Sequence, residues 1–128
     1  MAVIAGSAAS DNRSVGPDPE LRSALLADRA GTANRIAALT ADLEAIVEAS
    51  RLVATDDEHD PEGATIAFER SQTTTFLEDA HKHLADLDSA LDRLEADDYG
   101  RCEICGNPIA AGRLIARPTA RTCIDCAT

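Results

Sequence analysis

The chain has 128 residues, and with two Phe, one Tyr and no Trp it lacks most of the bulky side chains that fill a thick globular core. This length suits one domain, or one elongated element with a small module, and it excludes a large enzyme core. The formal net charge of −11 would repel a phosphate backbone, which argues against free DNA as the main partner.

Residues 1–17 are small and polar, and they carry too few large apolar groups to offset the cost of ordering them. We expect a flexible N-terminal tail there. No apolar run reaches the roughly 18 to 20 residues needed to cross a bilayer, and the start of the chain lacks a basic region ahead of a long apolar stretch. We therefore expect a cytoplasmic protein with no membrane partner.

The first predicted helix begins at Asp18-Pro19-Glu20. Asp can cap exposed amides, Pro fits the first helical position, and Glu favours the positive end of the helix dipole. The large apolar residues that follow are spaced by three and four if Arg29, Thr32 and Ser50 fill the intervening positions, which predicts a coiled-coil seam. These residues are Leu25, Ile36, Leu39, Leu43, Ile46 and Val53. Gly31 and Thr32 weaken the middle of this seam.

A second helix-start signal, Asp60-Pro61-Glu62, follows the acidic stretch 55–59, which has no apolar periodicity. Another seam comes after it at the same spacing, with two imperfect polar positions. It consists of Ile66, Leu77, Ala80, Leu84, Leu87, Leu91 and Leu94. Gly100 offers a helix stop, so we expect this helix to end near Asp98.

Two seams of similar length joined by a short acidic loop favour an antiparallel hairpin. In that arrangement Val53 should lie near Ile66, and Leu25 near Leu94. The same seam could also pair two hairpins into a four-helix bundle. We expect a monomer.

All cysteines of the chain fall in two Cys-x-x-Cys pairs with 17 residues between them, a spacing typical of four-thiolate zinc sites. The predicted ligands are Cys102, Cys105, Cys123 and Cys126. Two residues between ligands let one tight turn aim both sulfurs at a single ion, and Gly106 permits that turn. Four thiolates leave no open coordination position, so we predict one structural Zn²⁺. The alternatives are two disulfides or a redox dithiol, but cytosolic thiols stay reduced and redox motifs normally come singly.

The predicted fold class is therefore mainly α: a long antiparallel two-helix coiled-coil hairpin with a small C-terminal four-cysteine zinc finger. The hairpin is expected over residues 18–98 with its tip near 55–61, and the finger over 99–128. No nucleophilic triad, phosphate-binding Gly loop or paired-carboxylate cleft is apparent, so we expect no enzyme activity. The finger's Arg residues could contact nucleic acid, but little aromatic surface is available for stacking.

A specific pattern runs through the finger as Tyr99-Gly100-Arg101-Cys102-Glu103-Ile104-Cys105-Gly106. It continues with Ile109, Arg113-Leu114, Ala116, Pro118 and Cys123-Ile124-Asp125-Cys126. In this pattern the chain resembles the DksA/TraR zinc-finger family. The resemblance implies a bacterial transcription regulator that binds RNA polymerase directly, places its coiled coil in the secondary channel, and does not read promoter DNA by sequence.

The resemblance also implies a functional tip, because members of that family carry Asp-x-x-Asp-x-Ala near the polymerase active centre. Counting back from the first cysteine, the matching positions are His59, Glu62 and Ala64. Ala64 is identical, Glu62 is a conservative change, and Asp60 sits one residue from the first expected Asp. The tip carboxylates could approach basic groups or the polymerase-bound magnesium, which favours carboxylate oxygens. They are Asp56, Asp57, Glu58 and Asp60. The alternative interpretation is a solvated loop.

Members of that family that respond to the alarmone ppGpp place basic residues on the second helix near the finger. Residues 78–86 hold Lys82 as the lone strong cation, which does not favour alarmone binding here. The alternative function is a zinc-stabilised coiled-coil adaptor that binds another protein and never enters the polymerase.

Overall fold

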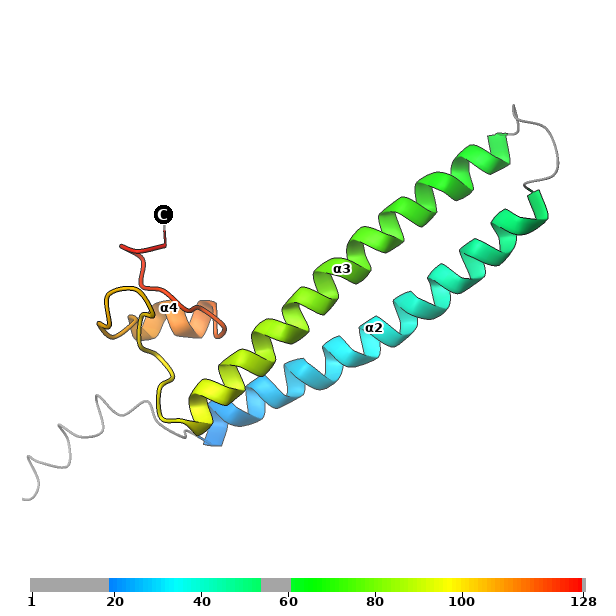
Figure 1. Ribbon diagram of the computed structural model, residues 1–128. Helices are drawn as coiled ribbons and strands as arrows, with labels where there is room; N and C mark the ends of the chain where they lie inside the picture. Colours follow the sequence, from blue (N-terminus) through cyan, green and yellow to red (C-terminus); the bar gives the residue numbers. More distant parts are fainter. Residues whose placement is uncertain (1–18, 54–60, 128) are drawn as a thin grey trace, which may run out of the picture. The chain divides into compact units, whose positions relative to one another are not determined.

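The computed structural model describes residues 19–53 and 61–127, and they are almost entirely helical outside the cysteine-rich segment (Figure 1). The described helices are α2 (Pro19–Val53), α3 (Pro61–Glu95) and the short α4 (Ala111–Ala116). Within the described residues, strand-type pairing is limited to one antiparallel bridge between Arg101 and Pro108. The predicted fold class is confirmed.

The described chain forms two compact units. The first, here called the cysteine unit, contains residues 19–28 and 86–127; the second, the seam unit, contains residues 29–53 and 61–85. Both long helices pass through both units. The boundaries predicted from sequence for the tail, hairpin and finger stay a prediction, and residues 1–17 and the tip at 55–60 lie outside the described residues. No helix in the described ranges combines the length and apolar character that a membrane span needs.

Both long helices start where their sequence signals place them. α2 begins at Pro19 with Glu20 in its first turn, and α3 begins at Pro61 with Glu62 in its first turn. The missing N–H of Pro costs nothing at the first helical position, and Glu there interacts favourably with the helix dipole.

The end of α3 differs from the prediction, because the helix stops at Glu95 and not near Asp98. Asp97 adopts a left-handed conformation with φ of 60°. The Asp98 N–H then donates to the Arg93 carbonyl at 2.8 Å, and the Asp97 N–H to the Leu94 carbonyl at 3.3 Å. This pair of bonds is the Schellman arrangement, which closes a helix with one left-handed residue. The stop comes from Asp97, three residues before the glycine that the sequence suggested.

In the cysteine unit, both long helices share one core with the finger. Leu25 of α2 is buried with Leu87 and Leu94 of α3, so the two helices run antiparallel here, and the predicted proximity of Leu25 to Leu94 is consistent with this cluster. The finger adds Tyr99, Cys102, Ile109, Leu114 and Ala120 to the same core. An ion pair between Arg22 and Glu95 joins the helices at its edge. Burying each large aliphatic side chain contributes roughly 1.5–3 kcal/mol, so this core holds the finger against the helix ends.

In the seam unit, the predicted apolar positions line the helix contact but stay half-buried. They are Ile36, Leu39, Leu43, Ile46, Ile66, Leu77 and Leu84. Only Thr32 and Ala80 are buried among the described residues of this unit, because two helices alone leave the flanks of their seam open to solvent. The Arg35 guanidinium lies over the Phe76 ring at 5.9 Å, which again joins α2 to α3. The side chain of Val53 lies outside those described, so its predicted approach to Ile66 stays a prediction.

Replacing a fully buried leucine of the shared core should destabilise the chain strongly. We expect Leu87→Ala to lower the free energy of unfolding by about 2–5 kcal/mol, because it removes buried methyl groups and leaves a cavity. The same change at Leu52, which is 72% exposed, should stay within about 0.5 kcal/mol of wild type. Urea denaturation followed by circular dichroism compares the two, and equal effects would contradict this assignment of the core.

The left-handed residue that ends α3 gives a second stability test. Asp97→Val should cost about 1–2 kcal/mol, because a β-branched side chain clashes with the backbone at positive φ. Asp97→Gly removes that clash and should leave the stability unchanged or higher. Thermal denaturation of both variants measures the difference, and a valine variant as stable as the glycine variant would argue against the Schellman ending.

Candidate metal centre

The first cysteine pair sits in a tight turn built from its own backbone. The Cys102 N–H donates to the Asn107 carbonyl at 2.8 Å, and the Gly106 N–H returns to the Cys102 carbonyl at 2.9 Å. Gly106 takes a φ of 78°, a conformation that other residues rarely adopt. This confirms the role predicted for the glycine directly after the first pair.

The second cysteine pair follows α4 and a short connecting segment. α4 is anchored by Leu114, which is buried in the core, and the Cys126 N–H donates to the Cys123 carbonyl at 3.1 Å within the pair. The two turns are joined directly by the Glu103 N–H, which donates to the Arg121 carbonyl at 2.9 Å. The chain thus brings together two pairs that are far apart in sequence.

The four sulfur atoms converge on one point. The Sγ atoms of Cys102, Cys105, Cys123 and Cys126 all lie within 4.8 Å of one another. The Sγ atoms of Cys105 and Cys123 are 3.8 Å apart, and all four thiols are free. A tetrahedral zinc ion with bonds of about 2.3 Å places its sulfur ligands about 3.8 Å from each other. The arrangement therefore fits a four-thiolate metal site and not two disulfides.

The thiols differ in how readily they lose a proton. Hydrogen bonding from the backbone of Cys105 lowers the pKa of Cys102 to about 6, with smaller help from Cys123 and Ile104, although burial opposes this. The hydrogen bond that Cys126 shares with the Cys123 side chain raises the pKa of Cys126 to about 12. A bound divalent cation overrides this order, because a coordinating thiol is held as the thiolate.

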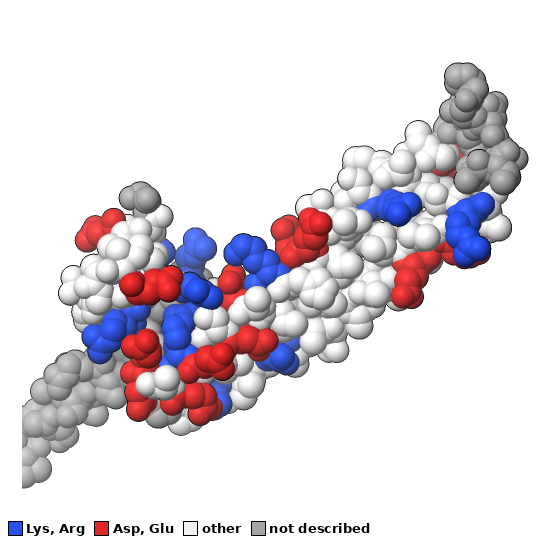
Figure 2. All heavy atoms as spheres, viewed as in Figure 1, with Lys and Arg blue, Asp and Glu red and all other residues white. Residues whose placement is uncertain are grey.

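Charged side chains of both signs cover the cysteine unit, and Figure 2 shows them intermixed on its visible face. The Arg101 Nε atom lies 3.6 Å from Asp98 Oδ1. The Arg121 Nη1 atom lies 4.0 Å from Glu103 Oε1. These ion pairs are exposed, so each contributes little to stability.

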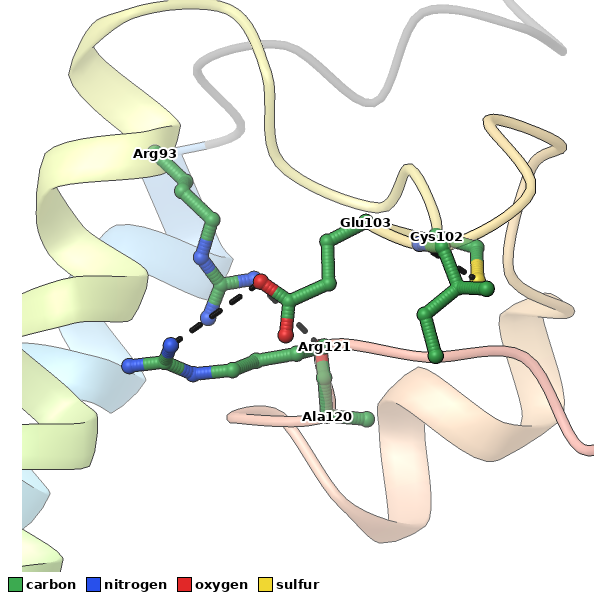
Figure 3. Close-up of polar contacts among 6 residues, drawn as sticks. Arg93, Cys102, Glu103, Ala120 and Arg121 are labelled. Carbon is green, nitrogen blue, oxygen red and sulfur yellow. Dashed lines mark hydrogen bonds and ion pairs between the residues drawn. The ribbon is translucent and has the colours of Figure 1, made fainter. Parts of the chain in front are cut away.

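Arg93 reaches from α3 toward the second turn, beside Arg121 and Glu103 (Figure 3). Its Nη1 donates to the Ala120 carbonyl at 3.4 Å, and its guanidinium lies 5.9 Å from the centre of the Tyr99 ring. Burial lowers the pKa of Arg93, and the nearby Arg121 lowers it further. The buried Nε and Nη2 atoms of Arg93 have no hydrogen-bond partner, and the charge is partly compensated by Tyr99 and by the carboxylates of Glu103 and Asp98.

The structure places only part of the predicted tip. Glu62 and Ala64 lie exposed in the first turn of α3. Asp57, His59 and Asp60 lie outside the described residues, so the tip assignment stays a prediction.

Sequence reasoning missed three side-chain contacts with the segment that leads into the second cysteine turn: Arg93 donates to the Ala120 carbonyl, Tyr99 to the Pro118 carbonyl and Arg113 to the Thr122 carbonyl. Arg93 looks like an ordinary surface cation of a helix, and Tyr99 and Arg113 entered only as part of a family pattern. The one available signal was that the single tyrosine of the chain directly precedes the first cysteine turn.

An antiparallel helix pair that shares its core with a four-thiol module defines a class of small helical C4-type zinc-finger proteins. Residues 97–128 match the family described as the prokaryotic dksA/traR C4-type zinc finger. The solved structure of transcription factor DksA2 from Pseudomonas aeruginosa is similar, with a TM-score of 0.68 and 31% identity over 84% of this chain and 77% of that one. The chain belongs to the DksA/TraR family, as its sequence pattern predicted.

The curated relatives that bear the name RNA polymerase-binding transcription factor DksA include one from Haemophilus influenzae and one from Escherichia coli K12. The one from Haemophilus influenzae is 38% identical over 89 residues, which cover 65% of this chain and 61% of that protein. The one from Escherichia coli K12 is 47% identical over 47 residues, which cover 37% of this chain and 31% of that protein. The chain thus matches less than two thirds of the length of either relative.

Proposed function

We propose that the chain is a transcription regulator that binds RNA polymerase through its secondary channel and presents its acidic tip to the active centre. The observation that carries this proposal is the likeness to the DksA2 structure across 84% of the chain at 31% identity. The names of the two curated relatives support the same partner. The likeness does not favour the alternative of an adaptor that never meets the polymerase.

The distribution of charge supports the tip as the active part. Residues 54–60 hold four acidic residues and no Lys or Arg. The seam unit that flanks them holds seven acidic against five basic residues, so its charge is nearly balanced. A concentrated carboxylate cluster can approach cationic groups or a magnesium ion, and it disfavours a nucleic-acid backbone. We therefore propose contact with the polymerase and no sequence-specific DNA binding.

We propose that one zinc ion, bound by the four cysteines, has a structural role. Four thiolates leave no open position for a substrate or water, so the ion would cross-link the two turns and take no part in chemistry. The finger supplies three large side chains to the shared core, Tyr99, Ile109 and Leu114, and metal binding in small zinc modules contributes on the order of 10 kcal/mol to folding. We propose no catalytic activity, and we propose that the chain acts as a monomer in the cytoplasm, where it would meet the polymerase.

Removing the metal should unfold the finger selectively. We expect one equivalent of zinc per chain purified under reducing conditions, and after chelation we expect fast amide exchange in residues 99–126. The seam unit should keep most of its helical circular dichroism, because its helix contact does not involve the cysteines. Unchanged exchange in 99–126 after verified zinc loss would contradict a structural role for the ion.

Neutralising the tip should separate binding from regulation. We expect the triple variant Asp57→Ala, Asp60→Ala and Glu62→Ala to be retained by core RNA polymerase in a pull-down and to lose most of its effect on open-complex lifetime in transcription in vitro. The matched control changes three exposed carboxylates of the seam unit, Asp42, Glu44 and Glu69, to Ala. It should behave as wild type. Failure of the wild-type chain to bind polymerase would favour the adaptor.

A further inference from the structure

The two cysteine turns are held in place by different means. The first turn is closed by backbone hydrogen bonds among residues 100–109, including the Ile109 N–H to the Gly100 carbonyl at 2.7 Å. The second turn has one such local bond, from Cys126 to Cys123. The segment leading into it, residues 117–122, has one local bond, from the Ala120 N–H to the Arg117 carbonyl at 3.0 Å, and its other carbonyl partners come from elsewhere in the chain.

Three side chains donate to alternate carbonyls of that segment. The Tyr99 hydroxyl donates to the Pro118 carbonyl at 2.7 Å. The Arg113 Nε donates to the Thr122 carbonyl at 2.9 Å. Between them, Arg93 donates to the Ala120 carbonyl (Figure 3), and this bond is longer, at 3.4 Å. Carbonyls 118, 120 and 122 therefore all face donors supplied by α3, α4 and the start of the finger.

The contact of Arg113 acts directly on a predicted metal ligand. The Thr122 carbonyl and the Cys123 N–H belong to the same planar peptide unit, so fixing one end of the plane fixes the direction in which Cys123 leaves it. Arg113 is itself held because the adjacent Leu114 is buried in the core. The peptide that precedes Cys123 is thus tied to α4.

Tyr99 acts at the other end of the segment. Its side chain is only 5% exposed and packs in the same core as Cys102 of the first turn. Its hydroxyl therefore joins Pro118, near the start of segment 117–122, to the part of the core that contains Cys102. These two contacts add to the backbone bond from the Glu103 N–H to the Arg121 carbonyl, which also joins the two halves of the site.

We propose that Arg113 and Tyr99 are positioning residues for the metal, which place Cys123 and Cys126 opposite the first pair without touching the ion. This inference rests on the proposed zinc site. Partners that orient metal ligands from outside the coordination sphere typically change metal affinity by 10–100-fold when they are lost. The contact of Arg93 is longer and should matter less.

The test compares two variants of equal charge in the full chain. Arg113→Met removes the donor, whereas Arg113→Gln keeps an N–H group the same number of bonds from the backbone as Nε. We expect zinc affinity, measured by competition with a chromophoric chelator, to fall about 10–100-fold for Arg113→Met and to stay near wild type for Arg113→Gln. Tyr99→Phe keeps the ring and loses only the donor, and it should weaken binding in the same direction.

Several outcomes would overturn the inference. Affinities of Arg113→Met and Tyr99→Phe within twofold of wild type would show that the contacts do not position the ligands. An Arg113→Gln variant as weak as Arg113→Met would show that charge, not the hydrogen bond, is responsible. If the wild-type chain bound no zinc, the proposed metal role would fall together with this inference, whereas unaffected variants of a zinc-binding wild type would remove the inference alone.

Discussion

Convergence of four thiols within 4.8 Å of one another is the constraint on which the cysteine unit depends. Cys102 is 1% exposed and belongs to the same buried cluster as Leu87 and Leu94, so the site is part of the hydrophobic core and not an appendage to it. The ends of α2 and α3 supply one side of this core, and the finger supplies the other. If either part unfolds, the apolar surface of the other part is exposed to water. Metal binding and helix packing should therefore stabilise each other.

Packing is uneven between the two units. The cysteine unit contains nearly all the buried apolar residues described, whereas the seam unit buries only Thr32 and Ala80. Thr74 and Thr75 of α3 also turn their hydroxyls back onto the carbonyls of Arg70 and Ser71, a contact that does not hold the two helices together. A unit with few buried contacts opens locally at lower free energy than one with a full core. The helix pair beside the proposed tip therefore has less tertiary support than the part beside the cysteines.

Much of this fold could be predicted from the sequence because its signals are local. Helix starts at Pro19 and Pro61, the seam spacing and the two Cys-x-x-Cys turns each depend on a few neighbouring residues. The predicted end of α3 was wrong by three residues. Glycine is the usual left-handed residue after a helix, but here Asp97 adopts that conformation. The donors from Tyr99 and Arg113 could not be predicted, since they join groups 19 and 9 residues apart whose meeting depends on the assembled core. The tip residues Asp57, His59 and Asp60 lie outside the described residues.

The left-handed Asp97 has a consequence for how α3 can vary in length. An α-helix turns by about 100° for each residue, so one residue inserted in the last turn of α3, before Glu95, would rotate the departing chain by more than a quarter turn. Tyr99 would then leave the core, and its hydroxyl would lose the Pro118 carbonyl. The end of α3 therefore sets the rotation of the finger about the helix axis. This part of the chain should tolerate substitutions far better than insertions or deletions.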